Sequence, residues 1–179
     1  MFEHDYPYAD TVSQRLGIAI RHIEFARKYS ASLLVDLEDD DWFWSPDQFT
    51  THIAWQVGHL AMSEYGLTLF RQRGRNLEVD SKLMSSKFRK LFMRGTKPLA
   101  DREAYPEPSE ILAVLDRVHQ QMQQEIVTFD GQQLDEPSDP PHAGFATRYG
   151  ALLFAGDHEM IHAGQIGMLR RLMGKEPLR

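Results

Sequence analysis

The chain has 179 residues, eight histidines and no cysteine, and its formal net charge at pH 7 is −6. This length suits a single domain, and the lack of cysteine excludes disulfides, thiolate zinc fingers, iron–sulfur clusters and a cysteine nucleophile. The negative charge argues against general nucleic-acid binding, and a hydrophobic content of 42 % argues against a disordered body.

At the N-terminus, residues 1–10 are acidic and polar, with neither the cationic start nor the apolar stretch of a secretory signal. The longest strongly apolar run, 149–156, is far shorter than the roughly 20 residues of a membrane span. We therefore expect a cytoplasmic protein.

Four segments have helical periodicity, and none has the alternation of a strand. The first, 10–37, places apolar residues at alternating steps of four and three, which is typical of a helix packed lengthwise in a bundle. The second helix is predicted to begin at 45–48, where an N-cap, a proline and a capping-box glutamine follow one another. Thr50 or Thr51 is an alternative start, and the helix ends near Gly74.

The third helix follows the proline-rich 106–108, and the fourth begins near Thr147 and ends at the C-capping Gly174. Four long amphipathic helices without strands predict an all-α four-helix bundle. We expect one domain over 1–179, with its core at about 10–174.

The connector between helices 2 and 3, at about 75–105, is longer than bundle loops usually are, and 86–93 is predicted to hold a short helix. Positive charge gathers here, because 71–97 carries nine cations and two acidic residues. Such a run is most often a solvated face or a subunit interface, while binding of an anionic substrate or of nucleic acid are the alternatives. The nine cations are Arg71, Arg73, Arg75, Lys82, Lys87, Arg89, Lys90, Arg94 and Lys97.

Histidines on predicted core faces carry the chemical information. His158 and His162 are four residues apart on the fourth helix, so both rings lie on one face and can reach one metal ion. His59 lies on the apolar seam of the second helix and can supply a third nitrogen if the two helices face each other. Three neutral imidazoles plus water form the open arrangement of a catalytic zinc site.

The other five histidines are left out of this site. A lone inward histidine is more often a core residue than a ligand, and His52 lies two turns, ~10.5 Å, from His59 along the helix axis. No convergent partner is evident for the rest. The five are His4, His22, His52, His119 and His142.

The segment 158–162 also matches the H-E-x-x-H signature of zinc proteases, in which the glutamate is the general base. The longer continuation of that signature is absent, and no strand-built substrate cleft is predicted, so protease activity is disfavoured. Glu159 is nevertheless a candidate proton acceptor beside the metal or a partner of its ligands. The simpler alternative is that Glu159 faces solvent or pairs with a cation.

Two motifs make the sequence resemble the DinB-like superfamily. They are W-x-x-G-H-L at 55–60 and H-x-x-x-H-x-G-Q at 158–165, about 100 residues apart, and the resemblance extends over roughly 10–174. It implies a four-helix bundle with one long connection, often as a homodimer. It also implies a divalent metal, typically zinc or nickel, and places its ligands at His59, His158 and His162, the residues that spacing selects. DNA binding is not implied.

Related families are thiol-dependent transferases or isomerases, and others are described as metal-dependent hydrolases. We therefore expect a metal-dependent enzyme that acts on a small molecule, either as a thiol-dependent transferase or as a hydrolase. In the first case the thiol must be an exogenous low-molecular-weight cofactor, because the chain has no cysteine. The alternative is a non-catalytic protein, in which a metal only rigidifies the bundle or the protein acts as a stress-related binding module.

Overall fold

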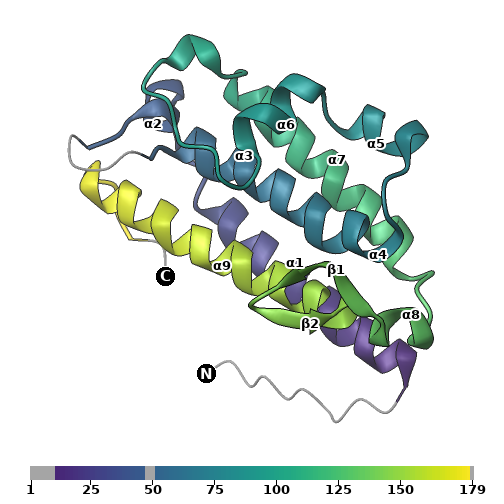
Figure 1. Cartoon of the computed structure of the whole chain (residues 1–179). Helices are drawn as coiled ribbons and strands as arrows, with labels where there is room; N and C mark the ends of the chain where they lie inside the picture. Colours follow the sequence, from purple (N-terminus) through teal and green to yellow (C-terminus); the bar gives the residue numbers. More distant parts are fainter. Residues whose placement is uncertain (1–10, 47–50, 178–179) are drawn as a thin grey trace.

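The computed structural model describes residues 11–46 and 51–177, and this part of the chain is mostly helical, as predicted. Four long helices lie side by side (Figure 1): α1 (Val12–Ser32), α3 (Ile53–Glu64), α7 (Pro108–Ile126) and α9 (Arg148–Leu172). A π-helical turn, η1 (Tyr65–Phe70), and the short α4 (Arg71–Arg73) extend α3 without a break. The remaining short helices are α2 (Asp39–Phe43), α5 (Leu77–Leu83), α6 (Ser86–Phe92), the 3-10 turn η2 (Arg102–Ala104) and α8 (Gly131–Asp135).

Side-chain caps mark the starts of α1, α3 and α9. Thr11 and Gln14 form a capping box at α1, and the Thr147 hydroxyl accepts from Gly150 N at α9, where the sequence predicts a start. α3 begins at Ile53, after the predicted starts at 45–48 and at Thr50 or Thr51. Its N-cap is His52, whose imidazole accepts from Trp55 N at 3.1 Å. Residues 47–50, which belong to the predicted starts, lie outside the described residues.

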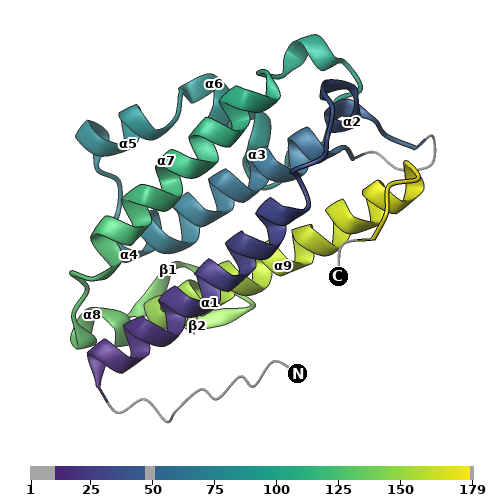
Figure 2. The same ribbon diagram turned by 180° about the vertical axis from the view of Figure 1, so that it is seen from behind.

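The long helices form two parallel pairs. α1 and α9 run in the same direction, since His22 meets Asp157 near their starts and Arg170 donates to the Leu33 carbonyl near their ends (Figure 2). α3 and α7 are likewise parallel neighbours, and the α3 side of the molecule runs antiparallel to α9. Two consecutive long helices can be parallel only if the chain returns along the whole bundle between them, which accounts for the long connector.

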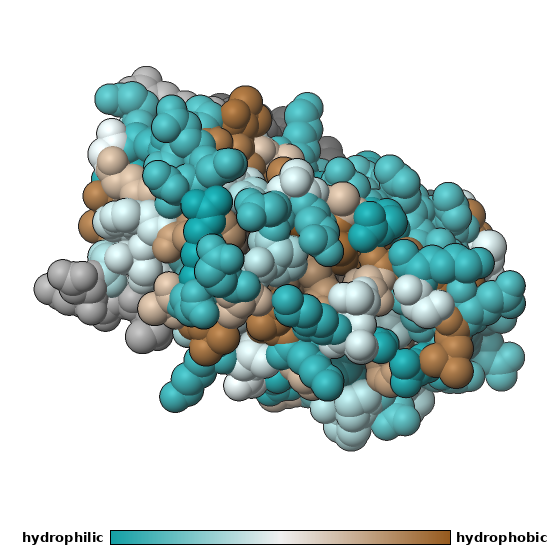
Figure 3. Space-filling view, turned by 90° about the horizontal axis from the view of Figure 1, so that it is seen from above, coloured by the Kyte–Doolittle hydropathy of each residue, from teal (hydrophilic) through white to brown (hydrophobic). Residues whose placement is uncertain are grey.

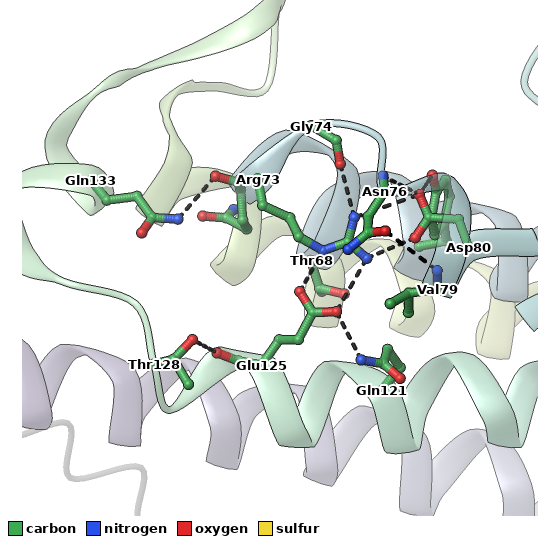
Figure 4. A network of polar contacts seen from close by, with 12 residues as sticks. Thr68, Arg73, Gly74, Asn76, Val79, Asp80, Gln121, Glu125, Thr128 and Gln133 are labelled. Carbon is green, nitrogen blue, oxygen red and sulfur yellow. Dashed lines mark hydrogen bonds and ion pairs between the residues drawn. The ribbon is translucent and has the colours of Figure 1, made fainter.

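A partly buried ion-pair group anchors this connector. The Arg73 guanidinium bridges Asp80 of α5, at 2.7 Å, and Glu125 of α7, at 2.5 Å, as Figure 4 shows. Asp80 also accepts from Tyr65 Oη at 2.7 Å and from Asn76 N at 2.9 Å. The predicted short helix of the connector is present as α6.

The sequence did not predict the short helices α2, α5 and α8, the turn η2 or a β-hairpin. β1 (Pro137–His142) pairs antiparallel with β2 (Phe145–Thr147) immediately before α9. Three prolines in β1 remove backbone donors and the strand is mostly exposed, so it has no hydrophobic alternation to detect. The Arg71 side chain fastens the hairpin to α4 by donating to Ser138 Oγ, at 2.8 Å, and to the Pro140 carbonyl.

The core is continuous between the four long helices and extends under the connector through Leu83, Phe88 and Phe92. The face seen in Figure 3 is mainly hydrophilic, with hydrophobic residues in small separate groups. Within the described residues, no helix combines the length and apolarity needed to cross a membrane.

Candidate metal centre

The antiparallel packing of α3 and α9 brings three histidines together. His59 comes from α3, and His158 and His162 come from successive turns of α9. One ring nitrogen of each lies within 4.8 Å of the others. The ring centroids are 5.0 Å apart for His59 and His162, 5.4 Å for His59 and His158, and 4.6 Å for the pair on α9. Spacing within a helix and packing between helices therefore select the same three residues.

The orientation of His59 follows from its hydrogen bonds. Its Nδ1 lies 2.7 Å from the backbone carbonyl oxygen of Phe92, and a carbonyl cannot donate, so Nδ1 carries the proton. The lone pair is thus on Nε2, which accepts from the Ser63 hydroxyl at 3.2 Å. Trp55 stacks on a face of the ring, with a centroid separation of 4.8 Å and an interplanar angle of 5°. The ring is held so that Nε2 is available as a ligand.

His162 is oriented by an amide. Gln56 donates through Nε2 to Thr51 Oγ1 at 2.7 Å, and its Oε1 faces His162 Nδ1 within hydrogen-bond distance. An amide oxygen has no proton to give, so the imidazole donates and its Nε2 carries the lone pair. Contacts of this kind, from an outer acceptor to the distal nitrogen of a histidine, are typical of metal-binding imidazoles.

His158 is the least constrained of the three rings. It is half-buried, and in the described part of the chain its ring contacts are with the other two histidines and with Phe154, at 5.9 Å between centroids. Phe154 in turn lies 5.2 Å from the ring of His142 on the hairpin. Phe154 thus lies between the hairpin and the ring of His158.

Burial keeps all three imidazoles neutral near pH 7. Burial, followed by the charges of His158 and His59, lowers the pKa of His162 to about 3. Burial followed by the charges of His59 and His142 lowers the pKa of His158 to about 4. For His59, burial lowers the pKa although its bond to Phe92 opposes this. Neutral imidazole is the form that binds a metal.

A glycine permits the close contact that orients His59. At Gly58 a Cβ atom would overlap the ring of Phe92, so only glycine lets that ring lie against the α3 backbone. The Phe92 ring is fully buried, and its carbonyl is then placed at His59 Nδ1. The glycine that precedes the histidine in the 55–60 motif therefore has a steric cause.

These residues fit a divalent ion of the zinc or nickel type. Two nitrogens bound tetrahedrally at about 2.05 Å are about 3.3 Å apart, so each ring must shift by no more than about 1 Å to bind one ion. Side-chain rotation supplies such a shift. A set of three imidazoles leaves at least one position open, and imidazole suits zinc, copper, iron and nickel better than calcium or magnesium.

Comparisons with known proteins agree with this architecture. A family model of the DinB superfamily matches residues 22–166, which include all three histidines and both motifs. The chain belongs to the DinB superfamily. A crystal structure of a conserved protein from Enterococcus faecalis shares the fold, with a TM-score of 0.61 and 17 % identity over 93 % of this chain and 100 % of that one. No curated protein matches.

In this DinB-superfamily chain, Glu159 does not join the histidine cluster. Its carboxylate accepts from Arg27 Nε at 2.7 Å, from Arg27 Nη2 at 3.2 Å and from the Ser30 hydroxyl, and it is buried. Of the alternatives that the sequence left open, these contacts correspond to pairing with a cation. Its role as a proton acceptor stays a prediction to which the contacts lend no support.

Four of the histidines that the sequence set aside have other contacts in the structure. His22 pairs with Asp157, His52 caps α3, His119 pairs with Glu64, and His142 stacks on Phe145. His4 lies outside the described residues.

The sequence did not predict Gln56, Ser63 and Phe92 as residues that contact the histidine cluster. Gln56 lies inside the 55–60 motif, where a polar residue on a buried helix is a usable signal. The contact of Phe92 is made by its backbone carbonyl, which no feature of the sequence reveals.

The basic segment 71–97 has divided roles. Arg71 holds the hairpin and lies over the ring of Phe145 at 5.1 Å, and Arg73 is the centre of the connector anchor. Most of the other cations are exposed, which fits the solvated-face interpretation.

Proposed function

We propose that His59, His158 and His162 hold a divalent metal ion, zinc or nickel, and that the protein is a metal-dependent enzyme acting on a small molecule. The observation that carries this proposal is the convergence of three neutral imidazoles, two of which have their distal nitrogens bonded to outer acceptors. Membership of the DinB superfamily adds support.

A divalent ion in such a site lowers the pKa of a water or thiol bound to it and so supplies a nucleophile near neutral pH. The chain's own residues would orient the ligands through the Phe92 carbonyl and Gln56, and the hairpin contacts Phe154 beside His158. Hydrolysis and thiol transfer are both open to this site. A thiol would be an exogenous cofactor, because no cysteine is present. The homodimer and the cytoplasmic location stay predictions.

Metal analysis of the untagged protein tests the proposal. We expect about one ion per chain in the wild type and in the control His22→Ala, which removes a histidine outside the cluster. His59→Ala is expected to lose metal affinity by more than about 100-fold, since loss of a ligand exceeds the 10–100-fold cost of losing an outer contact. A wild type that binds neither zinc nor nickel when these are added would refute the metal site.

The cobalt- or nickel-substituted protein separates the enzyme classes. A thiolate charge-transfer band on addition of a small thiol supports the transferase version. An unchanged spectrum at millimolar thiol argues for hydrolysis. A metal that raises the melting temperature but exchanges no ligand supports the non-catalytic alternative.

A further inference from the structure

Ser63 is the protein group bonded to the ligand nitrogen of His59. It lies one turn further along α3, is half-buried, and its Oγ is 3.2 Å from Nε2. The Phe92 carbonyl places the proton of this ring on Nδ1, so the hydroxyl must be the donor. The Ser63 hydroxyl thus donates a hydrogen bond to the lone pair of His59 Nε2. A metal ion at this site would bind the same lone pair.

Metal binding would deprive this hydroxyl of its acceptor. The Cα of Ser63 is fixed in α3, one turn from His59, so its Oγ would remain close to an ion held by His59 Nε2. A donor within 3.2 Å of a ligand nitrogen lies within hydrogen-bond reach of an atom that enters a neighbouring coordination position.

The other donors around the three rings are already used. Trp55 Nε1 donates to Thr96 Oγ1 at 3.3 Å, and the Gln56 amide donates to Thr51. Phe92 contributes a carbonyl, and Phe154 contributes an apolar ring. Among the described residues with these contacts to the rings, Ser63 is the one whose donor is released when a metal binds.

We propose that Ser63 donates its hydroxyl hydrogen bond to the coordinating atom of a small anionic ligand, a thiolate sulfur or an oxyanion oxygen, at the open position of the metal. The inference rests on the proposed metal site and names the class of ligand that this site selects. Anions whose coordinating atom keeps a lone pair gain the bond, whereas neutral ligands without one do not.

The test compares Ser63→Ala with the wild type, both loaded with cobalt, by visible titration with azide, 2-mercaptoethanol and imidazole. Azide and the thiolate keep a lone pair on the coordinating atom, and imidazole does not. We expect Ser63→Ala to weaken binding of azide and of the thiolate about tenfold, because one hydrogen bond to an anion is lost. Imidazole affinity should change by less than about twofold. An effect on only one of the two anions would show which coordinating atom Ser63 prefers, the sulfur of a thiolate or the nitrogen or oxygen of another anion.

Two further measurements make the result decisive. Ser63→Thr keeps the hydroxyl and should keep the anion affinities. Cobalt affinity itself should not fall in Ser63→Ala, since the hydroxyl competes with the metal for Nε2. An equal loss for all three ligands, or a tenfold loss of cobalt affinity, overturns the role of Ser63 while the three-histidine site stands. A wild type that binds no cobalt overturns the metal site and this inference together.

Discussion

A backbone carbonyl decides which nitrogen of His59 carries the lone pair. Because the Phe92 oxygen can only accept, Nδ1 is protonated and Nε2 keeps the lone pair, and Gln56 imposes the same choice on His162. Two of the three rings are thus held in a tautomer that leaves Nε2 able to bind a metal ion. His158 lacks such a partner among the described residues, so its ring is the one left to adjust.

Replacing Gln56 tests this orientation at the scale of one residue. Gln56→Met removes the acceptor at similar volume and is expected to weaken zinc binding 10–100-fold, measured by competition with a chromophoric chelator. Gln56→Glu keeps an acceptor of the right geometry and should retain or raise the affinity.

The matched control is Gln132→Met, on the exposed face of α8, which should leave zinc binding unchanged. Equal affinities of Gln56→Met and wild type would contradict the orienting role.

At the scale of the element, α3 and its N-cap contain three features close together in the sequence: the cap, a close contact with the ring of Phe92, and a candidate metal ligand. His52 begins the helix, Gly58 admits the ring of Phe92, and His59 receives the carbonyl of that same residue. The connector helix α6 is therefore part of the site, because its last residue positions a ligand on α3. The long connector thus orients a histidine of the candidate metal centre as well as linking two parallel helices.

Adding a methyl group at Gly58 should separate α3 from α6. Gly58→Ala forces the Phe92 ring to move, and we expect the free energy of unfolding to fall by about 1–3 kcal/mol. Zinc affinity should fall as well, because the Phe92 carbonyl moves with its ring. Urea unfolding and chelator competition measure the two effects.

Gly167→Ala on α9 is the control, since nothing lies within 4 Å of the added Cβ there. It should be neutral or stabilise the helix by up to about 1 kcal/mol. Similar losses in both variants would show that the close approach at Gly58 is not the cause.

For the whole molecule, one buried network joins the four long helices. Arg27 of α1 pairs with Glu159 of α9 and with Glu64 of α3, at 2.8 Å, and Glu64 also bonds to His119 of α7 at 2.7 Å. Burial opposes the charge on Arg27, but the two carboxylates raise its pKa overall, so Arg27 stays charged. This network fixes the helices that carry the candidate ligands.

Removing the central cation should leave two buried carboxylates uncompensated. We expect Arg27→Met to lower the free energy of unfolding by about 3–5 kcal/mol in urea titration. Replacing Arg27, Glu64 and Glu159 together with methionine removes all three charges and should cost much less. A triple variant as unstable as the single one would refute the explanation by unpaired charge.

The same network predicts a pH dependence. Burial lowers the pKa of His119, but its hydrogen bond and the charge of Glu64 outweigh this and raise the pKa overall, with Glu24 adding to the rise and Arg27 opposing it. The protonated form therefore contributes stability that is complete below about pH 6.5, the unfolded value, and is lost as pH rises through the folded pKa.

Wild type should exceed His119→Gln in unfolding free energy by about 1.5–3 kcal/mol at pH 5.5, and by less at pH 9. In the Glu64→Gln background the pH dependence of this difference should shrink, because the charge that raises the pKa is gone. A difference that is constant with pH would contradict the assignment.

The sequence by itself determined the helical class, the approximate spans of the long helices and the three candidate ligands. Periodicity and the i, i+4 spacing of His158 and His162 are local properties that one chain segment expresses alone. The tertiary structure decided which helices run parallel and which buried groups orient the histidine rings. It also decided that Glu159 forms an ion pair with Arg27. These depend on contacts between residues such as His59 and Phe92, or Gln56 and His162, that are far apart in the chain and leave no periodic signal.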